Sequence, residues 1–297
     1  MSIRHKIATV WKTARNSFQA LMLHRKVIRS FVWQSLDGTV DHSNWGDDIN
    51  YFFLKEIVDE PLIMASTLQP GVYRRVDNYL GIGSIIGMIS DERSIVWGSG
   101  IIDSTLSELP KPKRICAVRG PKTREKLLEL GYDCPEIYGD PALLLPLHYN
   151  PQRTQKHNFG IIPHFSEFDI AKGIIPESEE VHYIKAKGYD DWHEFINEIL
   201  ESEVVLTSSL HGLIVSEAYG VPCVWVEFDG CKPRDRFKYD DFYLSIGKSG
   251  IDPVIIKNAD QLKELAKAKA NWRKGEIDLN PLISACPLKL KKNALKA

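Results

Sequence analysis

A histidine follows a run of hydroxyl residues where an apolar stretch gives way to a helical pattern. The segment is Thr207-Ser208-Ser209-Leu210-His211-Gly212, directly after the apolar residues 204–206. Ser208 or Ser209 can cap the helix, which places His211 in its first turn. The helix dipole there favours anions and a neutral imidazole, so His211 can give or take a proton beside a bound phosphate. A capping or core histidine is the structural alternative.

Two further segments place cations where an anion could bind. Arg119 ends an apolar run, and its planar guanidinium suits bidentate binding of a carboxylate or a phosphate. A later loop follows another apolar run and carries four cations: Lys232, Arg234, Arg236 and Lys238. The alternatives are an exposed arginine and a solvated loop.

Three loops combine glycines with polar side chains, a pattern that lets a ligand approach the backbone closely. They are Asn44-Trp45-Gly46-Asp47-Asp48, Trp97-Gly98-Ser99-Gly100 and Gly139-Asp140-Pro141-Ala142. A fourth loop, Gly81-Ile82-Gly83-Ser84, resembles a short phosphate-binding turn but lacks the full glycine spacing. Helix capping by Asp47 or Asp48 and tight packing of the turns are the structural alternatives.

Such loops need a scaffold that brings strand ends together. From residue 30, short apolar runs predict strands at 31–34, 62–65, 79–82, 94–97, 114–118 and 136–138, and helical patterns fall at 48–58, 84–90 and 121–130. After a polar, proline-containing break at 146–158 the alternation resumes, with strands at 159–163, 181–184, 204–206 and 223–227 and helices at 192–200 and 210–219. This alternation predicts an α/β protein of two Rossmann-like, doubly wound halves, residues 30–147 and 148–297. Ligands of such sheets bind at the carboxyl ends of the strands, so we expect a cleft between the halves.

Residues 1–29 form a separate basic segment. Seven cations and no acidic residue precede Asp37, and the apolar residues within 3–22 have helical spacing. Such a helix can lie on an anionic membrane surface, or it can pack against the domain or a partner chain. The rest of the chain has 31 basic and 39 acidic residues. Its net negative charge excludes a generic nucleic-acid binder.

The overall composition is that of an ordinary globular protein, with 43% hydrophobic and 26% charged residues. No apolar run approaches the about 18 residues that span a bilayer. The five cysteines show neither a disulfide framework nor zinc spacing, which favours reduced thiols in a cytoplasmic compartment. No metal-ligand cluster is visible, so the sequence calls for neither a metal nor a cofactor.

Taken in order, the loops at 44–47, 98–100 and 139–142, Arg119 and the segment 208–212 resemble the polysaccharide pyruvyl transferase family, in particular its bacterial exopolysaccharide branch. The resemblance covers roughly residues 30–247. It implies a GT-B-like fold and transfer of a pyruvyl group from phosphoenolpyruvate to a sugar of a polysaccharide or its lipid-linked precursor. The products would be a cyclic ketal and free phosphate.

The resemblance matches His211 to the family's catalytic histidine and Arg119 to a functional arginine near the donor. It implies that the remaining residues of these motifs contact substrate: Asn44, Gly46, Asp47, Gly98, Ser99, Gly100, Asp140, Ser208, Ser209 and Gly212. Some members carry arginine where this chain has Ser209. We therefore expect one of Arg234, Arg236 and Lys238 to supply that contact with the anion.

Two other functions remain open at this point. A GT-B glycosyltransferase that uses a sugar nucleotide would share the cleft and the phosphate site at a helix terminus. A catalytically silent binding subunit of a polysaccharide assembly would explain both Ser209 in place of arginine and the basic N-terminal helix. Release of phosphate from phosphoenolpyruvate, release of nucleotide from a sugar nucleotide, and binding without turnover distinguish the three.

Overall fold

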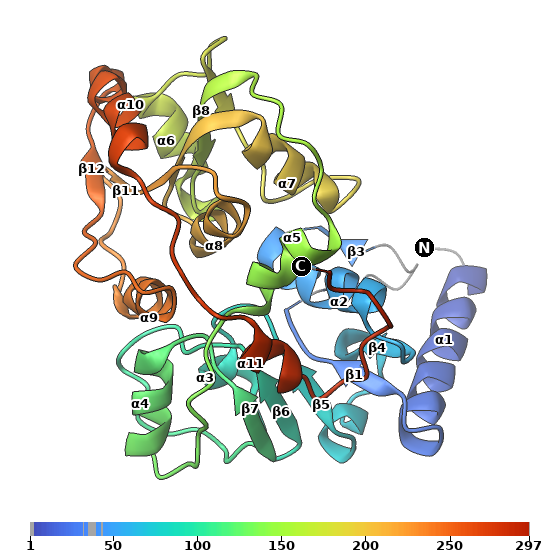
Figure 1. The fold of residues 1–297 in the computed structure, drawn as a ribbon. Helices are drawn as coiled ribbons and strands as arrows, with labels where there is room; N and C mark the ends of the chain where they lie inside the picture. The colour runs from blue at the N-terminus through green and yellow to red at the C-terminus, as the bar shows by residue number, and fades with distance from the viewer. Residues whose placement is uncertain (1–2, 32, 35–39, 43, 297) are drawn as a thin grey trace.

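Two parallel five-stranded sheets lie at the centre of the two halves of the chain (Figure 1). The computed structural model describes residues 3–31, 33–34, 40–42 and 44–296. The first sheet has the strand order β4-β1-β5-β6-β7 and the second β12-β11-β10-β8-β9. Counted within its own half, each sheet therefore has the same doubly wound order, with the first strand between the second and third. The expected α/β architecture of two Rossmann-like halves is confirmed.

The strands are short, and most of their residues are buried. Those of the first half are β1 (Lys26–Ile28), β4 (Leu62–Met64), β5 (Asn78–Leu80), β6 (Ser94–Trp97) and β7 (Arg114–Ala117). Those of the second half are β8 (His157–Ile162), β9 (Val181–Tyr183), β10 (Ser202–Thr207), β11 (Cys223–Phe228) and β12 (Val254–Ile256). A separate antiparallel pair is formed by β2 (Trp33–Gln34) and β3 (Val40–Asp41). Val32, within the strand expected at 31–34, lies outside the described residues.

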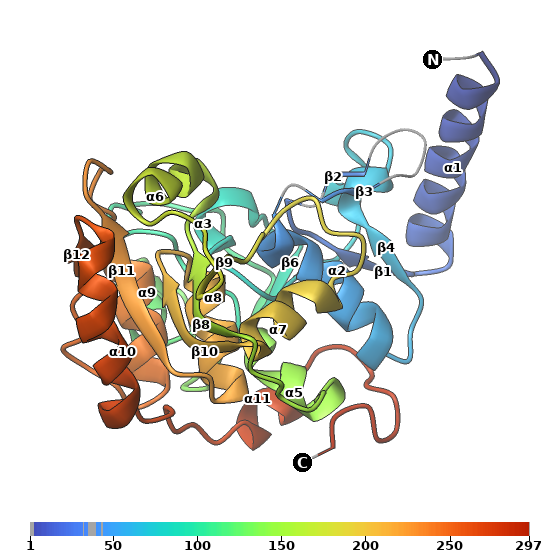
Figure 2. The same cartoon turned by 90° about the horizontal axis from the view of Figure 1, so that it is seen from above.

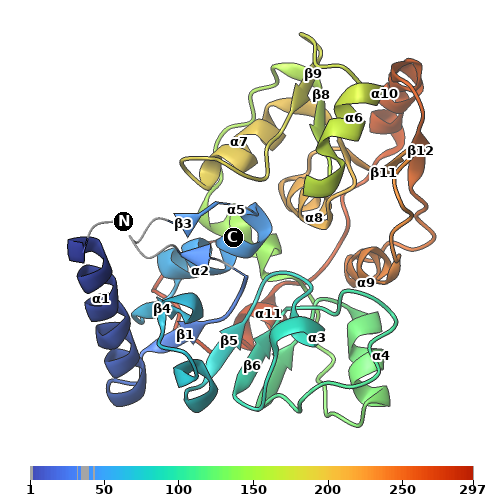
Figure 3. The same cartoon turned by 180° about the vertical axis from the view of Figure 1, so that it is seen from behind.

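Helices connect the strands within each half. In the first half they are α2 (Trp45–Ile57), α3 (Ile86–Ile89), α4 (Pro121–Glu129) and α5 (Leu145–His148), preceded by α1 (Ile3–Met22). In the second half they are α6 (Phe168–Ile174), α7 (His193–Leu200), α8 (Leu210–Tyr219), α9 (Phe237–Ser245), α10 (Leu262–Asn271) and α11 (Asn280–Ser284). Figure 3 shows α8 and α9 of the second half on the side that faces the first half.

The local sequence explains why strand and helix meet at the centre of the second sheet. Strand β10 is rich in buried β-branched residues, as expected for a strand covered on both faces. Helix α8 follows it after two serines and ends at Gly220, whose φ of 70° is the left-handed conformation that terminates many helices. The first turn of α8 is therefore held at the carboxyl end of β10.

The strand order creates one switch point in each sheet. In the first sheet it falls between β1 and β5, next to the Gly83 loop and the start of α2. In the second sheet it falls between β8 and β10, next to Pro163 and the start of α8. Ligands of doubly wound sheets bind at such switch points.

An apolar core runs across the boundary between the halves. The Trp45 ring stacks on Phe195 with 4.4 Å between ring centroids, and its Nε1 donates to the Trp192 carbonyl over 2.7 Å. The chain also returns to the first half at its end, where Leu290 bridges to Val58. The Leu282 carbonyl accepts from Trp97 Nε1 over 2.8 Å. Residues of the last helix and tail thus stabilise the first sheet.

Some elements differ from the sequence expectation. The expected strand at 136–138 is wrong, because only Tyr138 pairs, through a single bridge to Val118, and Pro135 and Gly139 flank it. Strand β1 lies within the segment that the sequence set apart as basic. Strand β12 and helices α6, α9 and α10 were not expected, since their patterns are short or strongly charged.

Candidate active site

A cavity of about 450 Å³ lies between the two halves, at the carboxyl ends of both sheets. Both halves contribute polar side chains to its wall. From the first half these are Asn44, Asp47 and Ser84; from the second half they are His164, Ser209, His211, Arg234 and Lys238. Apolar residues complete the lining, among them Phe31, Ile85, Ile102 and Phe165.

His211 lies in the first turn of α8 and packs against the start of α2. A Cβ atom on Gly46 would stand 2.0 Å from His211 Nδ1, so only glycine leaves room for this ring. The Nε2 atom is buried and has no hydrogen-bond partner among the described residues. An unpartnered, buried imidazole nitrogen at a cavity wall is uncommon, because burying a polar atom without a partner is unfavourable. The nitrogen is therefore available to a bound ligand.

Burial and nearby cations keep the cavity's histidines neutral. Burial, followed by the charges of Lys238 and Arg119, lowers the pKa of His211 to about 3. Burial and the charges of Arg234 and Lys238 lower the pKa of His164 to about 4. Both rings are therefore uncharged at neutral pH, and each has a nitrogen lone pair that can accept a hydrogen bond.

Two of the three cations proposed to replace an arginine at position 209 line this cavity. Arg234 donates from Nε and Nη2 to Glu167 Oε1 over 3.0 and 2.6 Å, which fixes its guanidinium at the cavity wall. Lys238 has no ion pair with any described residue, and its Nζ lies 5.0 Å from the centre of the Tyr239 ring. Burial, with the charge of Arg234, lowers the pKa of Lys238 to about 8. Arg236 turns away, toward Asp252 and the Ile251 carbonyl.

Arg119 is fully buried and lies behind the cavity wall. Its Nε donates to Asp241 Oδ2 over 2.9 Å, its Nη1 to Ser84 Oγ and its Nη2 to the Ile101 carbonyl over 2.9 Å. Asp241 belongs to α9 of the second half, so this ion pair joins the two halves. Arg119 can influence a ligand through Ser84, which does line the cavity.

Several residues expected to contact substrate also support this frame. A Cβ atom on Gly100 would stand 2.3 Å from Arg119 Cζ, so this glycine makes room for the guanidinium. Ser99 Oγ donates to the Gly83 carbonyl over 2.8 Å. Asp140 accepts from Gly83 N and Ala142 N, and burial raises its pKa to about 6.

The remaining glycines of the motifs and Ser208 also pack within the protein. A Cβ atom on Gly98 would meet Pro141, and one on Gly212 would meet Thr207. Ser208 Oγ donates to Glu167 Oε2 over 2.5 Å and accepts from His164 N over 2.9 Å. Ser208 therefore links the two strand ends of the second switch point.

At the start of α2, Asn44 and Asp47 face the cavity together. Asn44 caps the helix by accepting from Gly46 N over 3.2 Å, and its Nδ2 donates to Asp47 Oδ2 over 2.6 Å. Burial raises the pKa of Asp47 to about 6, against the lowering effect of the Asn44 hydrogen bond. The carboxyl group is thus mostly ionised at neutral pH.

Sequence reasoning missed three residues of the site: His164, Glu167 and Asp241. His164 could have been found, because it follows an apolar strand at the same edge as His211. Glu167 and Asp241 could not, since their roles depend on contacts with Arg234 and Arg119 that only the fold creates.

Within the described ranges, no three His, Cys, Asp or Glu side chains gather in the arrangement of a metal site. None of the helices in the described part of the chain is both long and apolar enough to span a bilayer.

The chain is similar to several known proteins. The profile of a family described as polysaccharide pyruvyl transferase matches residues 77–230. Protein L143 of Acanthamoeba polyphaga mimivirus is 30% identical over 75% of this chain and 79% of its own. The succinoglycan biosynthesis protein ExoV of Rhizobium meliloti is 27% identical over 74% of this chain, and the match spans 65% of that relative's length. A solved structure of the wall teichoic acid polymerase TagF aligns over 95% of this chain and 90% of its own, with 13% identity and a TM-score of 0.44.

Proposed function

Since this chain belongs to the polysaccharide pyruvyl transferase family, we propose that it transfers a pyruvyl group from phosphoenolpyruvate to a sugar. The product is a cyclic ketal across two hydroxyl groups, and inorganic phosphate is released. The acceptor is a glycan of exopolysaccharide biosynthesis or its lipid-linked oligosaccharide precursor, in keeping with the relative that acts in succinoglycan biosynthesis. We place the reaction in the cytoplasm, in keeping with the free thiols of all five cysteines.

The composition of the cavity wall carries this proposal. Phosphoenolpyruvate has a carboxylate and a phosphate, and Arg234 and Lys238 offer cations to such an anion from the second half. The first turn of α8 adds the positive end of a helix dipole beside His211. A small, doubly anionic donor matches this set of groups.

The chemistry needs two proton transfers, and the atoms balance without a further reactant. A proton adds to the methylene carbon of phosphoenolpyruvate, and a sugar hydroxyl bonds to C2. Phosphate then leaves with the electrons of the C2–O bond, and the second hydroxyl closes the ketal. The two sugar hydroxyls lose two protons in total. The new methyl group gains one proton and the phosphate gains the other.

We assign the proton acceptor to His211, because its ring is neutral, its Nε2 is unpartnered, and the negative charge of a bound donor would offset the cations that lower its pKa. Once protonated, the ring can return the proton to the departing phosphate, so that one group serves as base and then as acid. Lys238 can stabilise the phosphate charge as it develops. Asp47, from the first half, can give the proton to the methylene carbon from its protonated form and, as the carboxylate, take the proton of the second hydroxyl, which restores it for the next turnover.

Phosphate release tests this proposal. The full chain is incubated with phosphoenolpyruvate and a panel of free and lipid-linked oligosaccharides, with sugar nucleotides as competing donors. We expect phosphate release that depends on one class of acceptor. Nucleotide release from a sugar nucleotide would instead assign the chain to glycosyl transfer. Acceptor binding without turnover of any donor would assign it to a silent binding subunit.

The close contact between Gly46 and the His211 ring predicts a large effect of one added methyl group. Gly46→Ala should lower turnover at least about tenfold, because the added methyl group would push the His211 ring out of position. A small displacement of a catalytic group lowers the reaction rate strongly. Gly173→Ala is the matched control, since a Cβ atom at Gly173 meets nothing within 4 Å. In a His211→Ala background, Gly46→Ala should cost little more. If the double variant loses the product of the two single-variant losses in turnover, the contact does not act through His211.

The pKa of Lys238 predicts the alkaline limit of donor use. Its folded-state pKa of about 8 lies below the ordinary value, so the ammonium charge is present below this pH and is lost as pH rises through it. We expect kcat/KM for the donor to fall above about pH 8, since this ratio reports ionisations of the free protein. Lys238→Arg should move this fall to higher pH, because arginine stays charged. Lys232→Arg is the control; an unchanged profile in both variants would remove Lys238 from donor binding.

A further inference from the structure

Helix α1 turns its largest apolar side chains outward. Trp11, Phe18 and Met22 are 73%, 58% and 63% exposed, and their spacing places them on one stripe of the helix. Val10 beside them is 64% exposed. The helix extends beyond the rest of the fold when the molecule is seen from above (Figure 2). We call this stripe of four residues the outer face.

The opposite side of α1, which packs on the first half, has mostly small and polar residues, with Leu21 partly buried at its end. Asn16 Nδ2 donates to Thr67 Oγ1 over 2.9 Å, and Ser17 Oγ accepts from Gln69 N over the same distance. Ala20 joins a small apolar cluster below them. An amphipathic helix of a globular protein normally buries its apolar side. Here the helix is attached by the other side, so its apolar residues remain available to a further surface.

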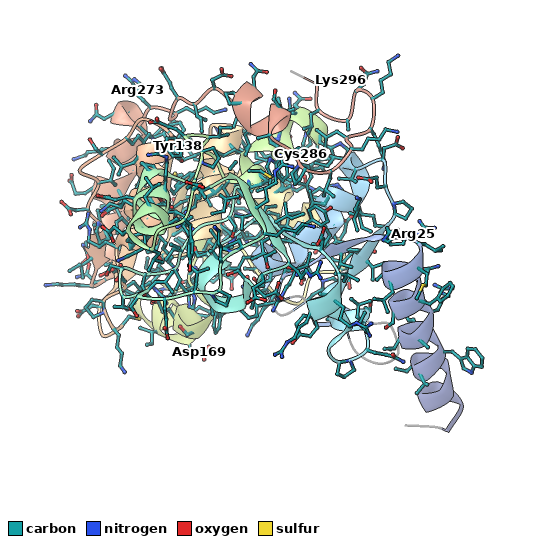
Figure 4. All side chains as sticks on the ribbon, turned by 90° about the horizontal axis from the view of Figure 1, so that it is seen from below. Arg25, Tyr138, Asp169, Arg273, Cys286 and Lys296 are labelled. Carbon is teal, nitrogen blue, oxygen red and sulfur yellow. The ribbon has the colours of Figure 1, made fainter. Side chains whose placement is uncertain are left out.

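The charges around α1 indicate which kind of surface the outer face could bind. All seven charged residues before Asp37 are cations, among them Arg15, which is exposed beside the outer face. At the foot of the helix, near Arg25 (Figure 4), a hollow of about 280 Å³ is lined by two of these cations and by three from elsewhere in the first half, of which Arg93 and Lys113 pair with Asp77. Its charged lining residues are Arg25, Lys26, Arg75, Arg93, Lys113 and one acid, Asp77.

A second copy of this chain is a poor occupant of the outer face. In a twofold dimer the same patch meets itself, so the cations of one α1 would lie against those of the other. Bare nucleic acid would satisfy the cations but not the exposed Trp11, Phe18 and Met22. A surface that is anionic and takes up apolar side chains satisfies both.

We propose that the outer face of α1, with the cations around it, docks on an anionic phospholipid membrane. Trp11 and Phe18 would enter the headgroup region, where amphipathic helices insert their apolar side. The cations would lie at the lipid phosphates, where each raises binding about fivefold and salt weakens the attraction. This goes beyond the proposed reaction and does not depend on it, because the vesicle test below involves no turnover.

Flotation of the full chain with vesicles tests the proposal. We expect binding to vesicles of phosphatidylcholine mixed with phosphatidylglycerol at low salt, a marked decrease at high salt, and little binding to phosphatidylcholine alone. The double variant Trp11→Ser/Phe18→Ser should lose at least about tenfold in binding. Leu128→Ser is its control, because Leu128 is an exposed leucine on α4. Arg15→Glu should lower binding about tenfold or more, whereas Lys263→Glu on α10 should not.

Three results would contradict the proposal. The first is a full chain that stays unbound with the mixed vesicles at low salt. The second is a Trp11→Ser/Phe18→Ser variant that binds as the parent does while its circular dichroism shows an intact fold. The third is a dimer in sedimentation that dissociates in the same double variant, because that result would assign the outer face to a second copy.

Discussion

His211→Asn should lower turnover by about 10²–10⁴-fold, the contribution expected of a positioned acid and base. Asparagine can hydrogen-bond to a ligand at this place, but it cannot exchange a proton near neutral pH. The free energy of unfolding should change little, since Nε2 of the histidine has no partner to lose among the described residues. Initial rates of phosphate release and a urea unfolding curve measure the two quantities.

His157→Asn is the matched control for this variant. His157 lies at the start of β8 and stacks on His182 with 4.8 Å between ring centroids, and it is not among the residues that line the cavity. Its replacement should leave turnover near that of the parent. A His211→Asn variant with nearly normal turnover would remove His211 from the mechanism.

Arg119→Met should destabilise the protein by about 3–5 kcal/mol, because it leaves the Asp241 carboxylate buried without its cation. Arg119→Lys should also be harmful, since a single ammonium cannot replace a guanidinium that reaches Asp241, Ser84 and a backbone carbonyl at once. Urea unfolding monitored by tryptophan fluorescence measures the loss.

Arg236→Met provides the comparison for this prediction. Arg236 also pairs with an aspartate, Asp252, but both side chains are exposed, and such pairs contribute only about 0–1 kcal/mol. If Arg119→Met is as stable as Arg236→Met and loses only donor affinity, Arg119 acts as a direct donor clamp. A loss of stability shows that it acts by joining the halves.

Much of the order of elements up to residue 228 could be predicted from the sequence, because it depends on local patterns. The apolar run of β10, the serines that precede α8 and the glycine that ends it are all visible within residues 202–220. The position of His211 at a strand end follows from them. The match to the polysaccharide pyruvyl transferase family, expected from the same motifs, is confirmed.

What each motif contacts could not be predicted, because contacts depend on distant parts of the chain. Arg119 has the sequence context of a ligand-binding residue, yet its partner Asp241 lies 122 positions away. Two glycines that we expected near a ligand lie close to side chains, Gly46 to His211 and Gly100 to Arg119. Spacing along the chain reveals that something approaches these glycines, but it does not reveal what.

The N-terminal helix is a second case in which contacts could not be predicted from the sequence. Its apolar and basic pattern fits both a packing helix, which the sequence favours, and a membrane helix. Only the contacts of Asn16 and Ser17 show which side is attached. The small polar residues carry too weak a signal to predict a buried side from sequence alone.

The most direct test of the account is to follow labelled carbon and phosphate together. Phosphoenolpyruvate labelled in its three carbons is supplied with an acceptor that supports phosphate release, and the glycan is analysed by NMR. The account predicts one pyruvate ketal on the glycan for each phosphate released, and neither product with His211→Asn. Phosphate release without labelled carbon in the glycan, or a glycan extended from a sugar nucleotide instead, would contradict it.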